Sequence, residues 1–426
     1  MNTRINALCD FLNASHSSFH AVAYIADLLR TQGYTALSET EAWDLVPGGK
    51  YYLIRGGTAI MAFRIPRETP AGFMLSASHS DRPCFKVKEN GELSGTYTRL
   101  AVERYGGQLL FTWMDRPLSI AGRVMVETDS GVESRLVDID RDLLLIPNVA
   151  IHMNRQVNDG YKWNPAVDML PLLGGKDSKG KLDTLLEEAA GGKILGHDLF
   201  LYIRETARVW GIDEEYISSA ALDDLECAWC CTQGFLKAQE AASIPVLCIF
   251  DNEEVGSSSR QGACSTLLSD LLERICESRD LDLKRMLGRS FMVSADNGHA
   301  LHPNHPELAD PTNAPVLGEG IAIKFNATLK YCTDGLSSAL FRKVCQKAGA
   351  KHQTYYNRAD IAGGSTLGNL SQQKISIPTV DIGLPQLAMH SCYETGAVAD
   401  AMALEDAMTA YYGSSLEING DSYQLI

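Results

Sequence analysis

Hydrophobic and polar positions follow two different periods along the chain, and these periods predict its elements. Short apolar runs rich in β-branched residues, such as Ile244–Phe250, are typical of buried strands, whereas apolar positions three and four residues apart predict helices. After residue 213 the two kinds of segment alternate. This alternation favours a mostly parallel sheet that is covered by helices on both faces.

The pattern divides the chain into three parts. Residues 1–94 contain an amphipathic helical pattern over 2–32 and strand patterns at 51–55, 59–65 and 73–77. Residues 95–213 begin with strand-like segments at 107–113 and 120–127 and continue into a polar, turn-rich stretch. In residues 214–426 we predict strands at 244–250, 290–295, 320–326, 352–356 and 375–382, and helices at 224–240, 265–278, 335–348, 365–372 and 396–412. The predicted fold class is α/β, with a sheet domain built from the two outer parts and a β-rich insertion at 95–213.

Length and charge narrow the possible functions. A chain of 426 residues is expected to form two or three domains. Its net charge of −15 and pI near 5.1 argue against nucleic acids and anionic membranes as partners. No apolar run is long enough to cross a bilayer, and the N-terminus lacks the pattern of a secretory signal. The sequence therefore predicts a cytoplasmic protein.

The cysteines favour a reducing environment. There are 11 of them, an odd number, and they are scattered singly through apolar stretches, which is typical of reduced core thiols. Cys227-x-x-Cys230-Cys231 could belong to a redox or thiolate–zinc site. No second Cys-x-x-Cys follows, however, and residues 225–236 have helical apolar spacing. We therefore interpret these cysteines as core residues.

The segment Asp251–Gly256 carries the strongest chemical signal. It directly follows the predicted strand 244–250 and places three carboxylates within four residues. Buried parallel strands deliver functional groups at their carboxyl ends, and crowded carboxylates repel one another unless a cation, a proton or water offsets them. A solvated acidic turn is the alternative interpretation.

Further candidate ligands lie at the ends of other predicted elements. His79 and Asp81 follow the apolar run 73–77, and residues two apart on an extended strand face the same side. Asp296 ends the run 290–295, and His390 follows the strand 375–382. Asp223-Asp224 precedes a helix and could act only as its N-terminal cap. Together these residues predict a site for zinc, with cobalt or manganese as possible substitutes, and two such ions would share a carboxylate.

Several longer motifs carry a family resemblance. They occur in this order: Phe11-Leu12-Asn13, Phe19-His20-Ala21-Val22, Pro47 to Tyr52, His79 to Cys84, Tyr105-Gly106-Gly107, Ala150 to Arg155, Leu222 to Leu225, Asp251 to Gly256, Ser294-Ala295-Asp296, His302-Pro303-Asn304 and Pro385 to Ser391. Over essentially its whole length the chain resembles the aspartyl aminopeptidase family, whose members are dinuclear zinc exopeptidases.

The resemblance assigns a role to each candidate ligand. Asp223 would bridge two zinc ions in each subunit. His79 and Asp296 would complete one ion site, and Glu254 and His390 the other. Glu253 would act as general base on a metal-bridging water, and Asp81 would orient His79.

The resemblance also implies an assembly and a substrate. The family's inserted domain is a dimerisation domain, and the family forms homo-dodecamers in which His152 would reach a neighbour's active site. Lys324 would contact an acidic substrate side chain, so the implied substrates are peptides with N-terminal Asp or Glu. Since a chain of charge −15 repels acidic peptides at long range, the preference would depend on the nearby cations Lys324, Arg82 and His152.

Four residues depart from frequent choices in the family, namely Arg82, Asp224, Asn252 and Tyr393. Arg82 and Tyr393 are expected near the cleft, where they would alter its charge. The same metal centre could instead serve a broad-specificity aminopeptidase or an N-acyl-amino-acid deacylase. A non-catalytic assembly protein is a further alternative, but a purely structural metal site has no use for a spare base such as Glu253.

Overall fold

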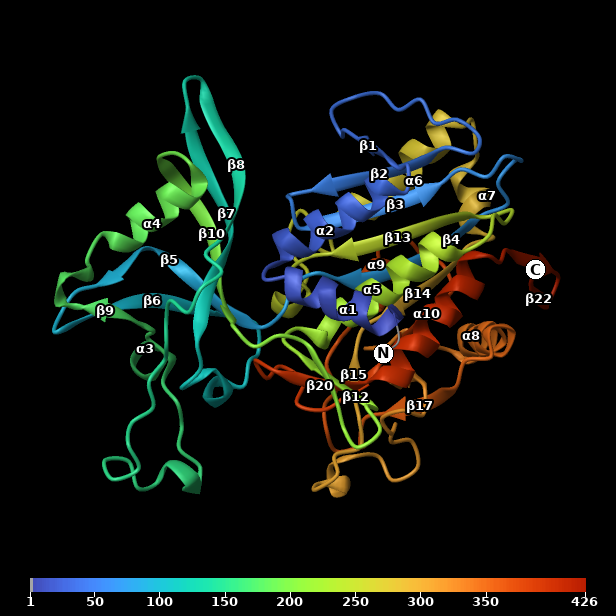
Figure 1. Ribbon diagram of the computed structural model, residues 1–426. Helices are drawn as coiled ribbons and strands as arrows, with labels where there is room; N and C mark the ends of the chain where they lie inside the picture. The colour runs from blue at the N-terminus through green and yellow to red at the C-terminus, as the bar shows by residue number, and fades with distance from the viewer. Residues whose placement is uncertain (1–2) are drawn as a thin grey trace.

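The structure, a computed structural model, describes residues 3–426 and is built around a nine-stranded sheet (Figure 1). The strand order is β1 (Thr35–Leu37), β2 (Lys50–Arg55), β3 (Ala59–Arg64), β13 (Ile244–Phe250), β4 (Phe73–His79), β14 (Phe291–Ala295), β18 (Thr379–Gly383), β16 (Ile321–Phe325) and β17 (His352–Tyr356). The central strands β13, β4, β14 and β18 run parallel to one another. The predicted α/β class is confirmed.

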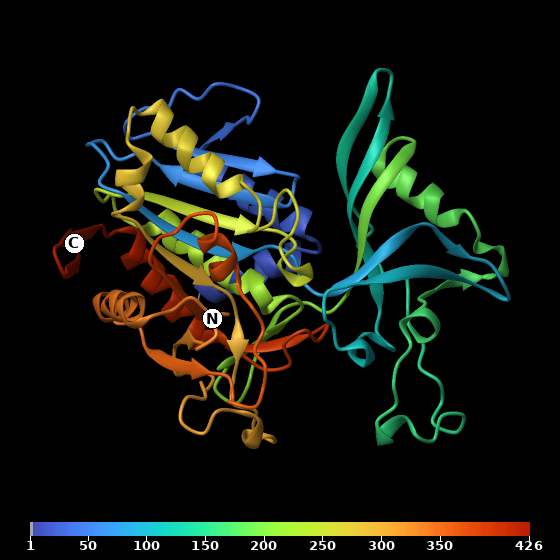
Figure 2. The same ribbon diagram turned by 180° about the vertical axis from the view of Figure 1, so that it is seen from behind.

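Helices cover both faces of this sheet because its strands are apolar on both sides. Along β13, Leu247 and Ile249 face one hydrophobic cluster, whereas Val246 and Cys248 face another, as the alternation of side chains on a strand requires. The first cluster is covered by α1 (Thr3–Ala14), α2 (Ser18–Thr31), α5 (Leu222–Lys237), α8 (Gly335–Ala348) and α10 (Val398–Tyr412). The second is covered by α6 (Leu267–Ser278), α7 (Leu283–Leu287) and α9 (Leu367–Gln372), on the face seen in Figure 2.

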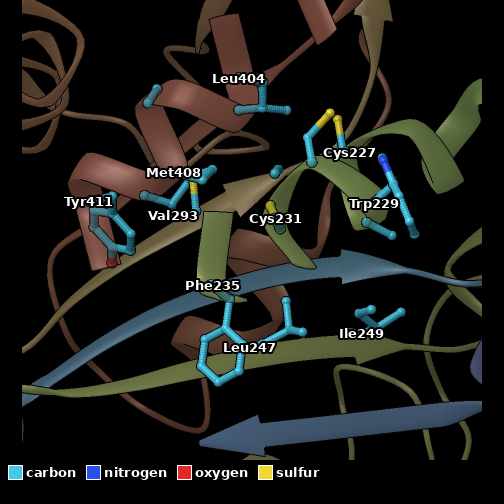
Figure 3. Packing of buried hydrophobic residues seen from close by; sticks show 14 of the residues in the cluster. Cys227, Trp229, Cys231, Phe235, Leu247, Ile249, Val293, Leu404, Met408 and Tyr411 are labelled. Carbon is cyan, nitrogen blue, oxygen red and sulfur yellow. The ribbon is translucent and has the colours of Figure 1, made fainter. Parts of the chain in front are cut away.

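The packing of α5 on the sheet and on α10 forms the centre of the first cluster (Figure 3). Cys227 and Cys231 are fully buried there, beside Phe235 and Met408. All 11 cysteines are free thiols. The interpretation of the cysteine motif as core packing is confirmed.

A second, antiparallel sheet lies beside the first (Figure 1). Its strand order is β8 (Gly131–Asp138), β7 (Leu118–Thr128), β10 (Ile194–Ile203), β5 (Cys84–Leu93), β6 (Tyr97–Tyr105) and β9 (Leu172–Gly175), and α4 (Lys181–Ala190) packs against it. The sheet thus begins with β5, before the predicted start of the insertion at residue 95, and its last strand ends before residue 213. A long connection containing α3 (Pro165–Asp168) projects from it.

Three predicted elements differ from the structure. The helical pattern over 2–32, whose first residue lies outside the described range, forms two helices, α1 and α2, separated by residues 15–17. The buried Ser15 hydroxyl in this break donates to the Phe11 carbonyl. The segment 107–113 is not a strand. Its residues Leu110–Trp113 form the 3-10 helix η1, in which only Trp113 is buried. The strand predicted at 375–382 begins only at Thr379, after Pro378, which has no N–H to donate to a sheet.

The remaining elements are short. β11 (Arg208–Trp210), β12 (Tyr216–Ser219) and β20 (Glu394–Ala397) form a three-stranded sheet, and two-stranded pairs join β15 (Gly298–His299) to β19 (Pro385–Gln386) and β21 (Leu416–Asn419) to β22 (Ser422–Leu425). Short 3-10 helices lie at η2 (Val157–Asp159), η3 (Lys176–Ser178), η4 (Glu253–Val255) and η5 (Pro306–Leu308). Among residues 3–426, none of the helices is both long and apolar enough to cross a membrane.

Candidate metal centre

The carboxyl ends of the central parallel strands bring the candidate ligands together. His79 is the last residue of β4 and is paired with Phe250, the last residue of β13. Asp296 directly follows β14, and its N–H donates to the carbonyl of Ile382 on β18. Because parallel strands end at the same edge of a sheet, the segments that carry Glu253, Glu254 and His390 start from this edge as well.

Asp223 lies at the centre of the group. It is buried, and its two oxygens face two different histidines. Its Oδ1 lies 3.5 Å from Nε2 of His79, and its Oδ2 lies 3.6 Å from Nε2 of His390. Oδ1 has no hydrogen-bond partner. Asp223 does not cap α5 with its side chain, so the alternative reading as a helix cap is wrong.

Further ligand atoms surround Asp223 on both sides. Nε2 of His79 is 3.8 Å from Oδ1 of Asp296, and Nε2 of His390 is 3.4 Å from Oε2 of Glu254. Around tetrahedral zinc with bonds of 2.0–2.1 Å, neighbouring ligand atoms lie roughly 3.3 Å apart. The observed spacings are long for hydrogen bonds and close to that value. The residues therefore fit a metal site of nitrogen and oxygen ligands.

The ligand atoms form overlapping sets. Within each set the ligand atoms lie within 4.8 Å of one another, and the sets are His79 with Asp223, Asp224 and Asp296; His79 with Glu253 and Glu254; and Asp223 with Glu254 and His390. Asp223 is common to the first and the last. The structure thus brings together all five predicted ligands and the predicted base.

Both histidines are oriented through their second ring nitrogen. Nδ1 of His79 lies 3.1 Å from the carbonyl oxygen of Asp81 and 3.2 Å from its Oδ1. Nδ1 of His390 lies 2.9 Å from the carbonyl oxygen of Gly107. Acceptors at Nδ1 fix the ring and leave Nε2 free as a ligand. Asp81 therefore stands where the sequence predicted it, beside His79.

Asp81 also holds the turn that carries the two glutamates. Its carboxylate accepts hydrogen bonds from the backbone N–H groups of Glu253 and Glu254, both at 3.1 Å. Asn252, which starts this turn, adopts a left-handed φ of 61°. The turn aims the two neighbouring side chains differently: Glu254 falls in a ligand set with Asp223 and His390 and in another with His79, whereas Glu253 falls in the set with His79 and Glu254.

The electrostatics of the centre favour a cation. Burial acts to raise the pKa of Asp223, but the nearby imidazoles of His390 and His79 outweigh it and hold the pKa below its ordinary value. For Glu254, burial and then the charge of Asp223 raise the pKa well above its usual range. Burial and the carboxylates of Asp296 and Asp81 also raise the pKa of Glu253, to about 8. A divalent ion would relieve this repulsion.

Comparison with known sequences places the chain in a family. The sequence model of the family described as aminopeptidase I zinc metalloprotease (M18) matches residues 11–412. The chain belongs to this family. It is therefore a zinc aminopeptidase, a hydrolase, and the resemblance inferred from its motifs is confirmed.

Relatives of this M18 aminopeptidase match it over nearly their full length. A probable M18 family aminopeptidase 2 from Clostridium novyi is 42% identical over 411 residues, which are 93% of this chain and 95% of the relative. A protein of the same name from Pseudomonas aeruginosa is 37% identical and covers 97% of this chain and 99% of its own.

Solved structures have the same fold. The cryo-EM structure of an Ape4 and Nbr1 complex contains a chain with a TM-score of 0.93 and 34% identity, covering 96% of this chain and 85% of that one. The structure of the S. cerevisiae mApe1 dodecamer gives a TM-score of 0.85 at 25% identity, covering 96% and 95% of the two chains.

One residue of the centre, Glu394, escaped the sequence analysis, and a second, Asp224, was given no role at the centre. Glu394 is buried, and its carboxylate accepts the backbone N–H of Asp223 at 3.0 Å and that of His390 at 2.7 Å. Asp224, considered from the sequence with Asp223 and as a departure from the family, is fully buried and accepts the backbone N–H of His79 at 3.0 Å. The spacing of Glu394, four residues after His390, was the available signal.

The other departures have structural roles. The guanidinium of Arg82 donates to the carbonyls of Ser15 and His16 and so holds the connection between α1 and α2. The hydroxyl of Tyr393 donates to the carbonyl of Thr206 at 2.8 Å. Arg82 is thus engaged by backbone rather than presented as a free cation.

The two predicted substrate residues lie in different surroundings. Lys324 is buried on β16, where its Nζ donates to the Asn297 carbonyl at 2.8 Å and lies 3.8 Å from Oδ2 of Asp296. His152 is exposed on the long connection of the second sheet, which projects away from the nine-stranded sheet (Figure 1). Within one subunit, the structure brings Lys324 to the centre but not His152.

The geometry predicts that Asp223 is needed to hold metal. Asp223→Asn keeps the size of the side chain but removes the charge that faces both histidines, so we expect the zinc content of the purified variant to fall to a small fraction of the wild-type value. Elemental analysis after gel filtration measures it. The surface variant Asp270→Asn is the matched control, and equal zinc in D223N and D270N would contradict the assignment.

Proposed function

We propose that this M18 aminopeptidase holds two zinc ions per subunit and removes N-terminal acidic residues from peptides. The observation that carries the two-ion proposal is the placement of Asp223, whose two oxygens face His79 and His390 separately. In this proposal His79 and Asp296 bind one ion, and Glu254 and His390 bind the other. When bound, such ions act as Lewis acids and lower the pKa of water toward neutrality.

In this proposal Glu253 is the general base. Its backbone N–H donates to Asp81, and its side chain lies in a ligand set with His79 and Glu254. Burial and the repulsion of neighbouring carboxylates raise the pKa of Glu253. Bound cations would offset this repulsion, and the ionised carboxylate could then accept a proton from water. Glu253 would take a proton from the attacking water and deliver it to the departing amine.

The acidic preference rests on Lys324. Burial acts to lower the pKa of Lys324, but the charge of Asp296 outweighs it and raises the pKa, so the ammonium stays charged. Its Nζ lies 3.8 Å from Oδ2 of Asp296, a proposed metal ligand, and in this proposal the first residue of a bound peptide lies beside it. A desolvated cation at this distance attracts a substrate carboxylate far more strongly than the distant negative charges repel it.

We infer that the protein acts as a homo-oligomer in which the exposed His152 completes a neighbour's active site. The S. cerevisiae relative forms a dodecamer. In this chain, the connection that carries His152 also exposes the apolar side chains of Val149, Ile151 and Met153, and clustered exposed apolar residues are typical of protein contact surfaces.

A substrate panel tests the proposed specificity. Purified protein supplied with zinc or manganese should hydrolyse Asp- and Glu-anilides at least about tenfold faster than Leu- and Arg-anilides, because one desolvated charge contact contributes about 1.5–3 kcal/mol. Equal rates on all four would indicate the broad-specificity alternative. Turnover confined to an N-acetyl amino acid would indicate the deacylase and refute the proposal.

The role of Glu253 is tested by Glu253→Gln. This variant keeps the shape and the backbone anchor but loses the base, so we expect wild-type zinc content with kcat lowered by about 10²–10⁴. Steady-state kinetics and elemental analysis measure the two quantities. The surface variant Glu240→Gln controls for the substitution itself, and a wild-type kcat in E253Q would show that the base is misassigned.

The contribution of His152 is tested with the assembled protein. Light scattering should give a mass far above the 46.5 kDa of one chain, and His152→Ala should lower kcat/KM on the Glu-anilide at least about tenfold without changing that mass or the zinc content. Gln156→Ala, on the same exposed connection, should match the wild type. A monomeric protein with full activity would refute the shared site.

A further inference from the structure

The end of β6 brings the second sheet into direct contact with the metal centre. Tyr105 is the last residue of β6, and Gly106 and Gly107 follow it. Tyr105 bonds Asp81, Gly106 lies beside Glu254, and Gly107 lies beside His390. The segment nevertheless continues from a strand of the second sheet. The carbonyl of Gly107 orients His390, whereas Tyr105 and Gly106 have no part in the proposed reaction described above.

The hydroxyl of Tyr105 joins two residues of the catalytic turn. It donates to Oδ2 of Asp81 at 2.7 Å and accepts a hydrogen bond from Nδ2 of Asn252 at 2.8 Å. Asp81 in turn accepts the backbone N–H groups of Glu253 and Glu254. The hydroxyl therefore holds the turn at two points. It bonds Asn252, the first residue of the turn, directly, and it bonds the Asp81 carboxylate that accepts the amides of Glu253 and Glu254.

The two glycines that follow allow the same segment to lie against the ligands. Gly106 has a φ of +77°, and a Cβ there would lie 3.2 Å from Cβ of Glu254 and 3.3 Å from Cα of Pro83. The carbonyl of Gly107 is the acceptor at Nδ1 of His390. A larger residue at position 106 would push the segment away from the glutamates.

The surroundings of Tyr105 keep its hydroxyl in place as a donor. Its ring packs edge-to-face on Phe200 of β10, with centroids 5.7 Å apart and an interplanar angle of 80°. Burial, followed by the charges of Asp81 and Asp251, raises the pKa of Tyr105 well above its ordinary value. The hydroxyl thus keeps its proton and donates it to the carboxylate.

We propose that Tyr105 is a positioning residue of the second sheet that holds Asp81 and the Asn252–Glu254 turn in the geometry needed for proton transfer by Glu253. The inference rests on the proposed role of Glu253 as base. It gives the second sheet a part in the chemistry of its own subunit, separate from any contact between subunits.

Tyr202 provides a matched control. It lies on β10 of the same sheet, and its hydroxyl donates to Oδ1 of Asp138, also at 2.7 Å. Its ring stacks on His16 of the nine-stranded domain at 3.9 Å. Tyr202→Phe thus removes a hydroxyl–carboxylate bond of equal length at the boundary of the two sheets, but away from the turn.

Kinetics of Tyr105→Phe test the proposal in the assembled, zinc-loaded protein. We expect kcat on the preferred anilide to fall about 10- to 100-fold, with KM and zinc content within twofold of the wild type, because small displacements of a reacting group cost rate rather than binding. Tyr202→Phe should keep kcat within twofold. A wild-type kcat in Y105F, loss of its zinc, or an equal fall in Y202F would overturn the proposal.

Hydrogen exchange supplies a readout that does not depend on activity. In Y105F the amides of Glu253 and Glu254 should exchange at least about tenfold faster than in the wild type, measured on a peptide spanning residues 251–257, whereas Y202F should leave them unchanged. Unchanged exchange in Y105F would overturn the proposal. If the wild type hydrolysed no anilide, the proposed function would fail, but this measurement would still decide whether Tyr105 holds the turn.

Discussion

The crowding of buried carboxylates around Asp223 is the constraint on which the rest of this structure depends. Asp224, Asp296 and Glu254 lie within a few ångströms of it at one edge of the sheet. In a protein interior such a group is stable only when protons, cations or hydrogen-bond donors offset the negative charge. The two histidines, the ammonium of Lys324 and a set of backbone N–H groups meet this requirement, and a divalent ion meets it most directly.

Backbone amides offset much of this negative charge, and most of them come from parts of the chain far from the carboxylates that they bond. Asp81 binds the amides of Glu253 and Glu254, and Glu394 binds those of Asp223 and His390. Each of these carboxylates thereby links two segments that carry candidate ligands. The ligand geometry is consequently fixed by residues that would not themselves contact a metal, which explains why so many acids are buried here.

The sequence predicted those parts of the site that follow from local pattern. His79 and Asp296 end apolar runs, so their place at the sheet edge could be derived from strand periodicity. The roles of Asp224 and Tyr105 could not be assigned in this way, because the residues they bond lie 24 to 147 residues away in the chain. Glu394 bonds His390, only four residues away, but its second partner, Asp223, is 171 residues away. No strand was predicted over Cys84–Leu93, where the second sheet begins, because Lys88, Glu89, Asn90 and Gly91 interrupt its apolar pattern. The strand predicted at 107–113 was wrong because apolar composition alone does not distinguish a strand from a short 3-10 helix.

The second sheet leaves and re-enters the host domain through β5 and β10, which are paired neighbours, with Phe200 opposite Lys86. With respect to the nine-stranded sheet domain, the whole second sheet is therefore comparable to a surface loop whose first and last strands lie side by side. The entropic cost of closing such a loop grows only slowly with its length, by about 0.6 kcal/mol for each doubling. The second sheet could thus be gained, enlarged or replaced during evolution with little effect on the folding of the nine-stranded sheet domain. A replacement would still need a Tyr-Gly-Gly segment at the position of Tyr105 to Gly107.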